Sequence, residues 1–188
     1  MAQARVAFEL VASQWGAAPG VVDAAFADIV ARYQEPHRCY HTLEHILEVL
    51  DRVSGAEVEL AAWYHDVIYD PRTSDSEERS AVHAGEALEY LRAPVEVIDE
   101  VQRLIRLTAG HHVQDGDDNG RMLIAADLAI LTMDRARYQR YARDVRAEYA
   151  HLDDVTWRAG RTAVLERLRT VVADDSNIVW ELGSLSVP

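Results

Sequence analysis

Lysine is absent from this chain of 188 residues, so all 19 basic residues are arginines. Without lysine the protein can use neither Schiff-base chemistry nor the phosphate-binding lysine of a P-loop. Cysteine is almost absent as well, because Cys39 stands alone. A single cysteine excludes an internal disulfide framework and a zinc site built from several thiolates.

Long apolar runs are also missing. No uninterrupted apolar stretch approaches the roughly 20 residues of a membrane-spanning helix, and charged residues interrupt the pattern of residues 1–16, which argues against a signal peptide. We therefore expect a cytoplasmic protein with no membrane partner. The net charge of −13 disfavours nucleic acid as a partner, since a phosphate backbone would be repelled. A small phosphorylated substrate, held by a metal ion and a few arginines, is compatible with this charge.

Apolar residues recur at the helical spacing of three and four along most of the chain. The predicted helices are 3–15, 20–33, 41–53, 57–69, 76–91, 95–109, 120–132, 134–150 and 153–173. No run alternates with the period of two that a half-buried strand shows. The sequence contains no recognisable linker or repeat. It therefore predicts one all-α domain over residues 1–175 and a weakly structured tail over residues 176–188.

Three of these helices carry ionisable residues where the pattern calls for apolar ones. His41 and His45 are four residues apart, which places them on one face of a helix. His65 and Asp66 interrupt the segment AAWYHDVIYD, and Asp127 interrupts AADLAIL. Taken alone, a His-Asp pair is more commonly a neutral imidazole that caps a carbonyl beside a rim aspartate. Three separate burials would each cost several kcal/mol, roughly, unless compensated, whereas one metal ion between packed helices compensates all of them.

The ordered set His … His-Asp … Asp resembles the HD superfamily of metal-dependent phosphohydrolases, and in particular a bacterial branch of predicted HD phosphohydrolases of about this length. The resemblance covers roughly residues 33–165. The motifs that carry it are R-x-Y-H-x-x-x-H at 38–45, A-x-W-Y-H-D-x-x-Y-D at 61–70, S-E-x-x-S-A at 76–81, T-x-x-H at 108–111 and A-D-L-x-I-L at 126–131. The resemblance to this family implies an HD-type helical bundle whose metal ligands are His45, His65, Asp66 and Asp127. Two imidazoles and two carboxylates suit a divalent ion such as Mn, Fe, Co, Ni or Mg, with Zn possible.

The stretch Tyr40-His41-x-x-x-His45 is also similar to the Y-H-N-x-x-H segment of cyclic-nucleotide phosphodiesterases, which share the HD architecture. That similarity implies that His45 binds the metal and that His41 protonates the leaving oxygen. Thr42 stands where those enzymes have asparagine. The reverse assignment, with His41 as the ligand and His45 facing the core, stays open at this point.

Further residues are candidates for supporting roles. Glu77 matches a family acid that would orient the nucleophilic water, or it is only a first-turn glutamate favoured by the helix dipole. His111 and His112 would bind the substrate phosphate or a second metal ion, although a helix C-terminus favours histidine by itself. Asp70 would hold a ligand imidazole in one tautomer or cap the helix end.

Arginines at spacings of three and four near the C-terminal end usually form a solvated helix face. Arg146, with Arg161 behind it, is nevertheless the candidate for contacting the substrate phosphate, because a guanidinium binds phosphate through two parallel hydrogen bonds. Arg146 belongs to a segment similar to the R-x-E-Y of the same family.

These features predict a metal-dependent phosphohydrolase that cleaves a phosphate ester or anhydride of a small nucleotide or another phosphorylated metabolite. A rival from another class is a non-catalytic sensor of metal or nucleotide on the same fold. An HD-type di-iron oxygenase is a weaker alternative, because those enzymes hold substrate with a lysine shortly after the doublet. A homo-oligomer is compatible with all three.

Overall fold

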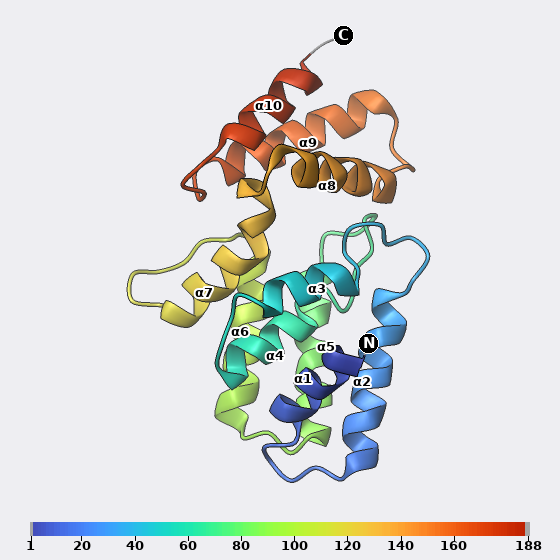
Figure 1. The fold of residues 1–188 in the computed structure, drawn as a ribbon, viewed down its shortest axis with the longest axis vertical. Coiled ribbons are helices and arrows are strands. Elements are labelled where there is room, and N and C mark those ends of the chain that lie inside the picture. Colours follow the sequence, from blue (N-terminus) through green and yellow to red (C-terminus); the bar gives the residue numbers. More distant parts are fainter. Residues whose placement is uncertain (1, 187–188) are drawn as a thin grey trace. The chain divides into compact units, whose positions relative to one another are not determined.

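The computed structural model describes residues 2–186, which form ten α-helices, one 3₁₀-helix and no β-strand (Figure 1). The elements are α1 (Ala2–Ala12), α2 (Pro19–Tyr33), α3 (Leu43–Leu50), α4 (Ala56–Tyr64), α5 (Ser76–Tyr90), α6 (Val95–Thr108), α7 (Asp118–Asp127), η1 (Leu128–Thr132), α8 (Arg135–Glu148), α9 (Asp154–Leu168) and α10 (Ser176–Leu185). The predicted all-α fold class is confirmed. Every helix between residues 2 and 186 is too short or too polar to cross a membrane.

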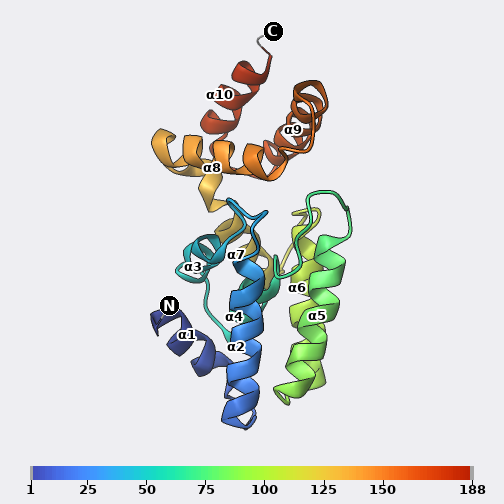
Figure 2. The ribbon, with the colours of Figure 1, turned by 90° about the vertical axis from the view of Figure 1, so that its right-hand side faces the viewer.

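The chain divides into two compact units, Met1–Ala126 and Asp127–Pro188, and each is described by itself. The predicted single domain over residues 1–175 stays a prediction. Within the first unit α5 and α6 lie side by side along most of their length (Figure 2). Both also contact α4, which lies at the centre of the unit.

Helix α4 is buried on all sides, as the even distribution of its apolar residues leads one to expect. Its last five residues, 60–64, have almost no exposed surface. Trp63 meets the rings of Phe8 from α1 and Phe26 from α2 edge-on, at centroid distances of 5.5 and 6.1 Å. Edge-to-face pairs of this kind add about 0.5–1.5 kcal/mol beyond area burial. The residue that follows this helix, His65, is therefore anchored to the best-packed part of the first unit.

The observed helices are shorter than the predicted ones next to the candidate metal ligands. Helix α3 begins at Leu43 with Thr42 as its N-cap, so the prediction that His41 and His45 share a helix face is wrong. Helix α4 ends at Tyr64 with His65 as its C-cap, and Asp66 lies in the turn that follows. Val67 and Ile68 continue the apolar spacing past this point, which is why the sequence pattern misses the helix end.

Predicted helix 120–132 is also divided. Helix α7 ends at Asp127, and the next five residues tighten into η1. The division places Asp127 at a helix end rather than within a continuous helix, and 3₁₀ segments are common at such ends.

In the second unit, residues 176–185 form α10, where the sequence predicted a weakly structured tail. Helix α10 packs on α9 and η1 (Figure 1). Asn177 donates hydrogen bonds to the carbonyls of Leu131 and Met133, at 2.9 and 2.8 Å. Glu181 forms a buried ion pair with Arg161 of α9. These contacts join α10 to residues far away in the sequence. The local sequence of α10 therefore does not show that it has packing partners.

Candidate metal centre

Three side chains from separate elements converge near the end of α4. His45 from α3, His65 at the C-cap of α4 and Asp127 at the end of α7 each offer one ligand atom, and these atoms all lie within 4.8 Å of one another. The two histidines are only 3% and 2% exposed. Two imidazoles and a carboxylate at this spacing can hold a divalent metal ion.

Asp66 lies beside both histidines. Its Oδ2 is 3.1 Å from Nε2 of His65 and 3.6 Å from Nε2 of His45. Burial raises the pKa of the Asp66 carboxyl, but the neighbouring imidazoles, with His65 foremost, outweigh burial and hold that pKa well below its ordinary value. The Asp66 carboxylate is therefore ionised at neutral pH and brings a negative charge to this group of side chains.

The Nε2 atoms of the two imidazoles lie close to each other and to Asp66, so they are the ring nitrogens positioned to act as ligands. Nδ1 of His65 lies 3.0 Å from the carbonyl oxygen of Ala62, and a carbonyl only accepts, so this nitrogen carries the proton. Nδ1 of His45 lies 3.1 Å from the hydroxyl of Tyr40. The two Nε2 atoms then face each other at 3.3 Å. Two imidazole nitrogens and two carboxyl groups gathered this closely are a donor set that fits a divalent metal ion.

Tyr40 is a site residue that sequence analysis missed. Its ring is buried and lies 4.8 Å from that of His45, centroid to centroid. Partners that hydrogen-bond to the far side of a ligand imidazole fix its orientation and tautomer. The sequence signal for Tyr40 was its place in the motif R-x-Y-H-x-x-x-H. The spacing of that motif does not reveal that Tyr40 contacts His45.

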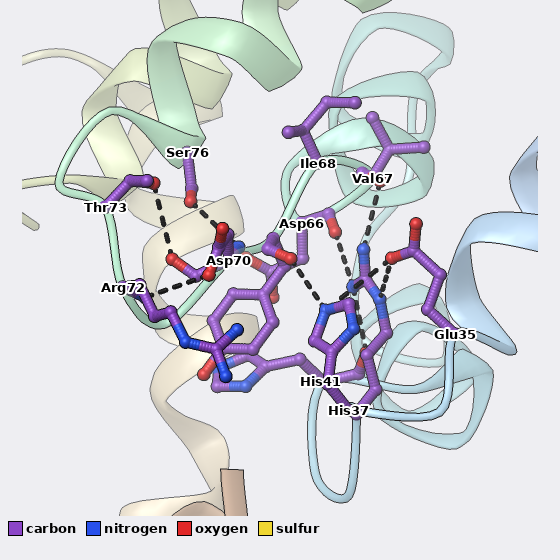
Figure 3. Close-up of polar contacts among 12 residues, drawn as sticks. Glu35, His37, His41, Asp66, Val67, Ile68, Asp70, Arg72, Thr73 and Ser76 are labelled. Atoms are coloured by element: carbon purple, nitrogen blue, oxygen red, sulfur yellow. Dashed lines mark hydrogen bonds and ion pairs between the residues drawn. The ribbon is translucent and has the colours of Figure 1, made fainter. Parts of the chain in front are cut away.

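Arg38 is a second missed residue. Its buried guanidinium donates hydrogen bonds to the carbonyls of His41, Asp66 and Val67, at 3.0, 2.8 and 3.1 Å (the dashed lines that end on these residues in Figure 3). The rings of Tyr33 and Tyr69 flank it, at 5.0 and 5.5 Å from the guanidinium carbon.

Arg38 thus ties the loop before α3 to the turn after α4. These bonds hold the carbonyls at 66 and 67 in the turn that follows α4. The arginine therefore sets the position of the Asp66 backbone.

His41 lies at the edge of the cluster rather than within it. Its ring contacts that of Tyr69 at a centroid distance of 4.2 Å and stands 6.1 Å from the ring of His45. It is half-buried, and it is near enough to Asp66 to help lower the pKa of that carboxyl. Of the two histidines, it is His45 whose ligand atom belongs to the compact group.

Ser80 of α5 also fastens the turn that carries Asp66. Its hydroxyl accepts a hydrogen bond from the amide of Ile68 at 3.0 Å and donates one to the carbonyl of the same residue at 3.1 Å. Ser80 is fully buried. The turn is therefore held from both sides, by Arg38 and by α5, and its geometry is preorganised.

Four predicted supporting residues lie outside the cluster. Glu77 is in the first turn of α5, and among residues 2–186 it makes no side-chain hydrogen bond or ion pair, so its catalytic role stays a prediction. Asp70 accepts a hydrogen bond from the amide of Arg72 at 3.0 Å and organises the turn before α5. Ala62 and Tyr40 contact Nδ1 of the two ligand imidazoles, and an orienting role for Asp70 stays a prediction.

His111 and His112 follow α6, as predicted. His111 has a left-handed backbone, with φ +58°, and its amide donates to the carbonyl of Leu107 at 2.9 Å. This backbone geometry is typical of a residue that terminates a helix. The position of His111 after α6 therefore follows from the end of the helix and does not require a bound ligand. His112 is exposed. Binding of substrate by either histidine stays a prediction.

The two arginines predicted to contact phosphate are engaged elsewhere. Arg146 donates to the carbonyl of Tyr149 at 2.9 Å and pairs with Asp154 at 2.8 Å, so it stabilises the connection between α8 and α9. Arg161 is buried and bonds to Glu181 through Nε at 2.8 Å and to the hydroxyl of Tyr141 through Nη1 at 3.1 Å. The sequence could not reveal this pairing, because it predicted no helix that would present Glu181.

Comparisons with known proteins return no match to a family model, a curated protein or a solved structure. The site is therefore defined by its own geometry. Residues 2–186 form an all-α chain in which two buried histidines and the partly buried Asp127 can hold a metal ion, and Asp66 lies against this group.

Proposed function

We propose that this protein is a metal-dependent phosphohydrolase of the HD type, acting on a small phosphorylated metabolite. The observation that carries the proposal is the meeting of His45, His65 and Asp127, whose ligand atoms lie within 4.8 Å of one another with Asp66 alongside. The order of these residues along the chain is that of the HD motifs. Oxygen and imidazole ligands without sulfur suit the divalent ions used in phosphate chemistry.

In this proposal His45, His65, Asp66 and Asp127 hold the ion. When bound, such an ion supplies polarisation of a phosphoryl oxygen and a water of lowered pKa. Tyr40 and the Ala62 carbonyl keep the two imidazoles oriented, while Arg38 holds the backbone on which Asp66 stands. The chain's residues thus supply a rigid site whose geometry does not need to reorganise during reaction.

His41 is the proton donor in this scheme. A water molecule gives up one proton to solvent as its oxygen bonds to phosphorus, the bond from phosphorus to the leaving oxygen breaks, and His41 supplies a proton to that leaving oxygen. Its partial exposure beside the buried ligands places it where a substrate can reach it. His41 is also one of the imidazoles that lower the pKa of the Asp66 carboxyl.

The decisive experiment measures turnover and metal content together. We expect the purified chain to bind a divalent ion and to release phosphate from members of a panel of nucleotides and phosphomonoesters when Mn²⁺ is present. His65→Ala is expected to lose both metal and turnover. His151→Ala, at an exposed histidine between α8 and α9, is the matched control and should retain both.

Two results would contradict the proposal. Metal retained by His65→Ala, measured by elemental analysis, would reject this ligand assignment. Stoichiometric metal in the wild type with no turnover on any member of the panel would favour the sensor instead.

A further inference from the structure

A polar cavity lies in the first unit, beside the turn that carries Asp66. Its volume is about 250 Å³, and three arginines, Arg32, Arg72 and Arg79, line it together with His37 and Tyr69. The arginines come from α2, from the turn before α5 and from α5 itself. No member of the His/His/Asp group lines this cavity, so it is distinct from the proposed metal site.

The cavity concentrates positive charge in a chain whose net charge is −13. Arg32 pairs with Asp28 through Nε, at 2.9 Å, which leaves its terminal nitrogens available. Arg79 is half exposed, and its nearest carboxylate oxygen, of Asp75, is 3.9 Å away. Among residues 2–186 the guanidinium of Arg72 forms no ion pair.

Two carboxylates also line the cavity, but both are already engaged. Glu35 accepts a hydrogen bond from Nε of Arg38 at 3.0 Å. Asp70 accepts one from the amide of Arg72 at 3.0 Å (Figure 3). Three guanidinium groups against two occupied carboxylates leave the cavity with an excess of hydrogen-bond donors. An oxyanion is the ligand that such a surface recognises.

Tyr69 forms the wall between this cavity and the proposed proton donor. His37 holds it in place, because Nε2 of His37 lies 2.8 Å from the Tyr69 carbonyl and the two rings stack at a centroid distance of 6.1 Å. The ring of Tyr69 in turn contacts that of His41 at 4.2 Å. A ligand in the cavity is thus one aromatic ring away from the residue that would protonate the leaving group.

We propose that this cavity binds a phosphoryl group other than the one that is cleaved. At about 250 Å³ it falls below the roughly 300–1,000 Å³ of pockets for drug-sized ligands, so it suits a phosphate group rather than a nucleobase. This inference rests on the proposed function. It narrows the substrate class to pyrophosphate-like compounds or small metabolites that carry two phosphoryl groups.

The test measures binding of inorganic pyrophosphate to the full-length protein by calorimetry, without added metal and with Mn²⁺. We expect Arg72→Gln to weaken binding roughly tenfold or more in both conditions, because it removes a charge-assisted contact. Arg143→Gln, at an exposed arginine of α8 that does not line the cavity, makes the same charge change and should alter binding less than about twofold. Circular dichroism should show both variants to be folded.

The inference would be overturned if the wild type did not bind pyrophosphate, or if Arg72→Gln bound it as tightly as the wild type. It would also be overturned if Arg143→Gln lost as much affinity as Arg72→Gln, because the binding would then depend on the overall charge and not on this cavity. Malonate binding as tightly as pyrophosphate would reject phosphoryl specificity. Failure of the proposed function would give a different result in these measurements. Pyrophosphate binding that depends on Arg72, in a protein without turnover on any substrate, would retain this cavity as a phosphoryl site and reject the hydrolase.

Discussion

His41 and His45 are four residues apart in the sequence but have different surroundings in the structure. His45 lies on α3, and its ring is buried and hydrogen-bonded to Tyr40. His41 precedes the helix, and its ring rests on that of Tyr69. The helix that would have placed both on one face begins two residues after His41, so the two rings are free to take different roles.

We predict that these two histidines separate metal binding from proton donation. His45→Ala should lose metal and activity together. His41→Ala should keep its metal and lose activity most with poor leaving groups, where a general acid contributes typically about 10²–10⁴-fold. Rates with an alkyl and an activated aryl phosphate, together with elemental analysis, decide between the roles. A metal-free His41→Ala beside a metal-loaded His45→Ala would reverse them.

Helix α10 shows, at the scale of elements, how one buried ion pair can hold a helix. The side chains of Arg161 and Glu181 are 5% and 8% exposed. Tyr138 adds a hydroxyl that donates to Glu181 at 2.5 Å. Removing one partner of a buried pair leaves the other charge uncompensated in a place that water cannot reach.

Glu181→Ala should therefore lower the free energy of unfolding by about 3–5 kcal/mol, measured by urea titration of the helical circular dichroism signal. Glu166→Ala, which breaks the exposed pair with Arg169, is the control and should leave the midpoint close to that of the wild type. The double variant Arg161→Met/Glu181→Leu should recover much of the loss, because it leaves no buried charge. A fully stable Glu181→Ala would show that the pair does not hold α10.

At the scale of the whole molecule, metal binding and folding should be linked. In the metal-free protein the carboxyl groups of Asp66 and Asp127 are crowded against two buried imidazoles, an arrangement that a bound cation stabilises. An ion that binds only the folded state stabilises it by about 2.7 kcal/mol at a concentration of 100 Kd.

Mn²⁺ should accordingly raise the midpoint of thermal unfolding, and a chelator should reverse the rise. His65→Ala should remove this dependence on metal, whereas His151→Ala should preserve it. The measurement is a thermal melt followed by circular dichroism at several metal concentrations. An equal rise in wild type and His65→Ala would mean that the ion binds elsewhere.

The fold and the ligands were predictable to different extents. Apolar periodicity located nine of the helices because most of them bury one face, and the residues of that face recur at a local spacing along the chain. The turn that carries Asp66 was not predictable, since the Arg38 guanidinium that binds the carbonyl of Asp66 comes from 28 residues earlier in the sequence. The partners of Arg146 and Arg161 were not predictable either, because they also come from other parts of the sequence.

By itself the sequence determined that the protein is helical, that it has no lysine or paired thiols for chemistry, and which side chains are able to bind a metal. Those properties depend on residue type and local spacing. The tertiary structure alone decided that His45, His65 and Asp127 meet, that Tyr40 and Arg38 support them, and that three arginines line a cavity beside Tyr69. Contacts between distant parts of a chain follow from packing, and packing leaves no periodic trace in the sequence.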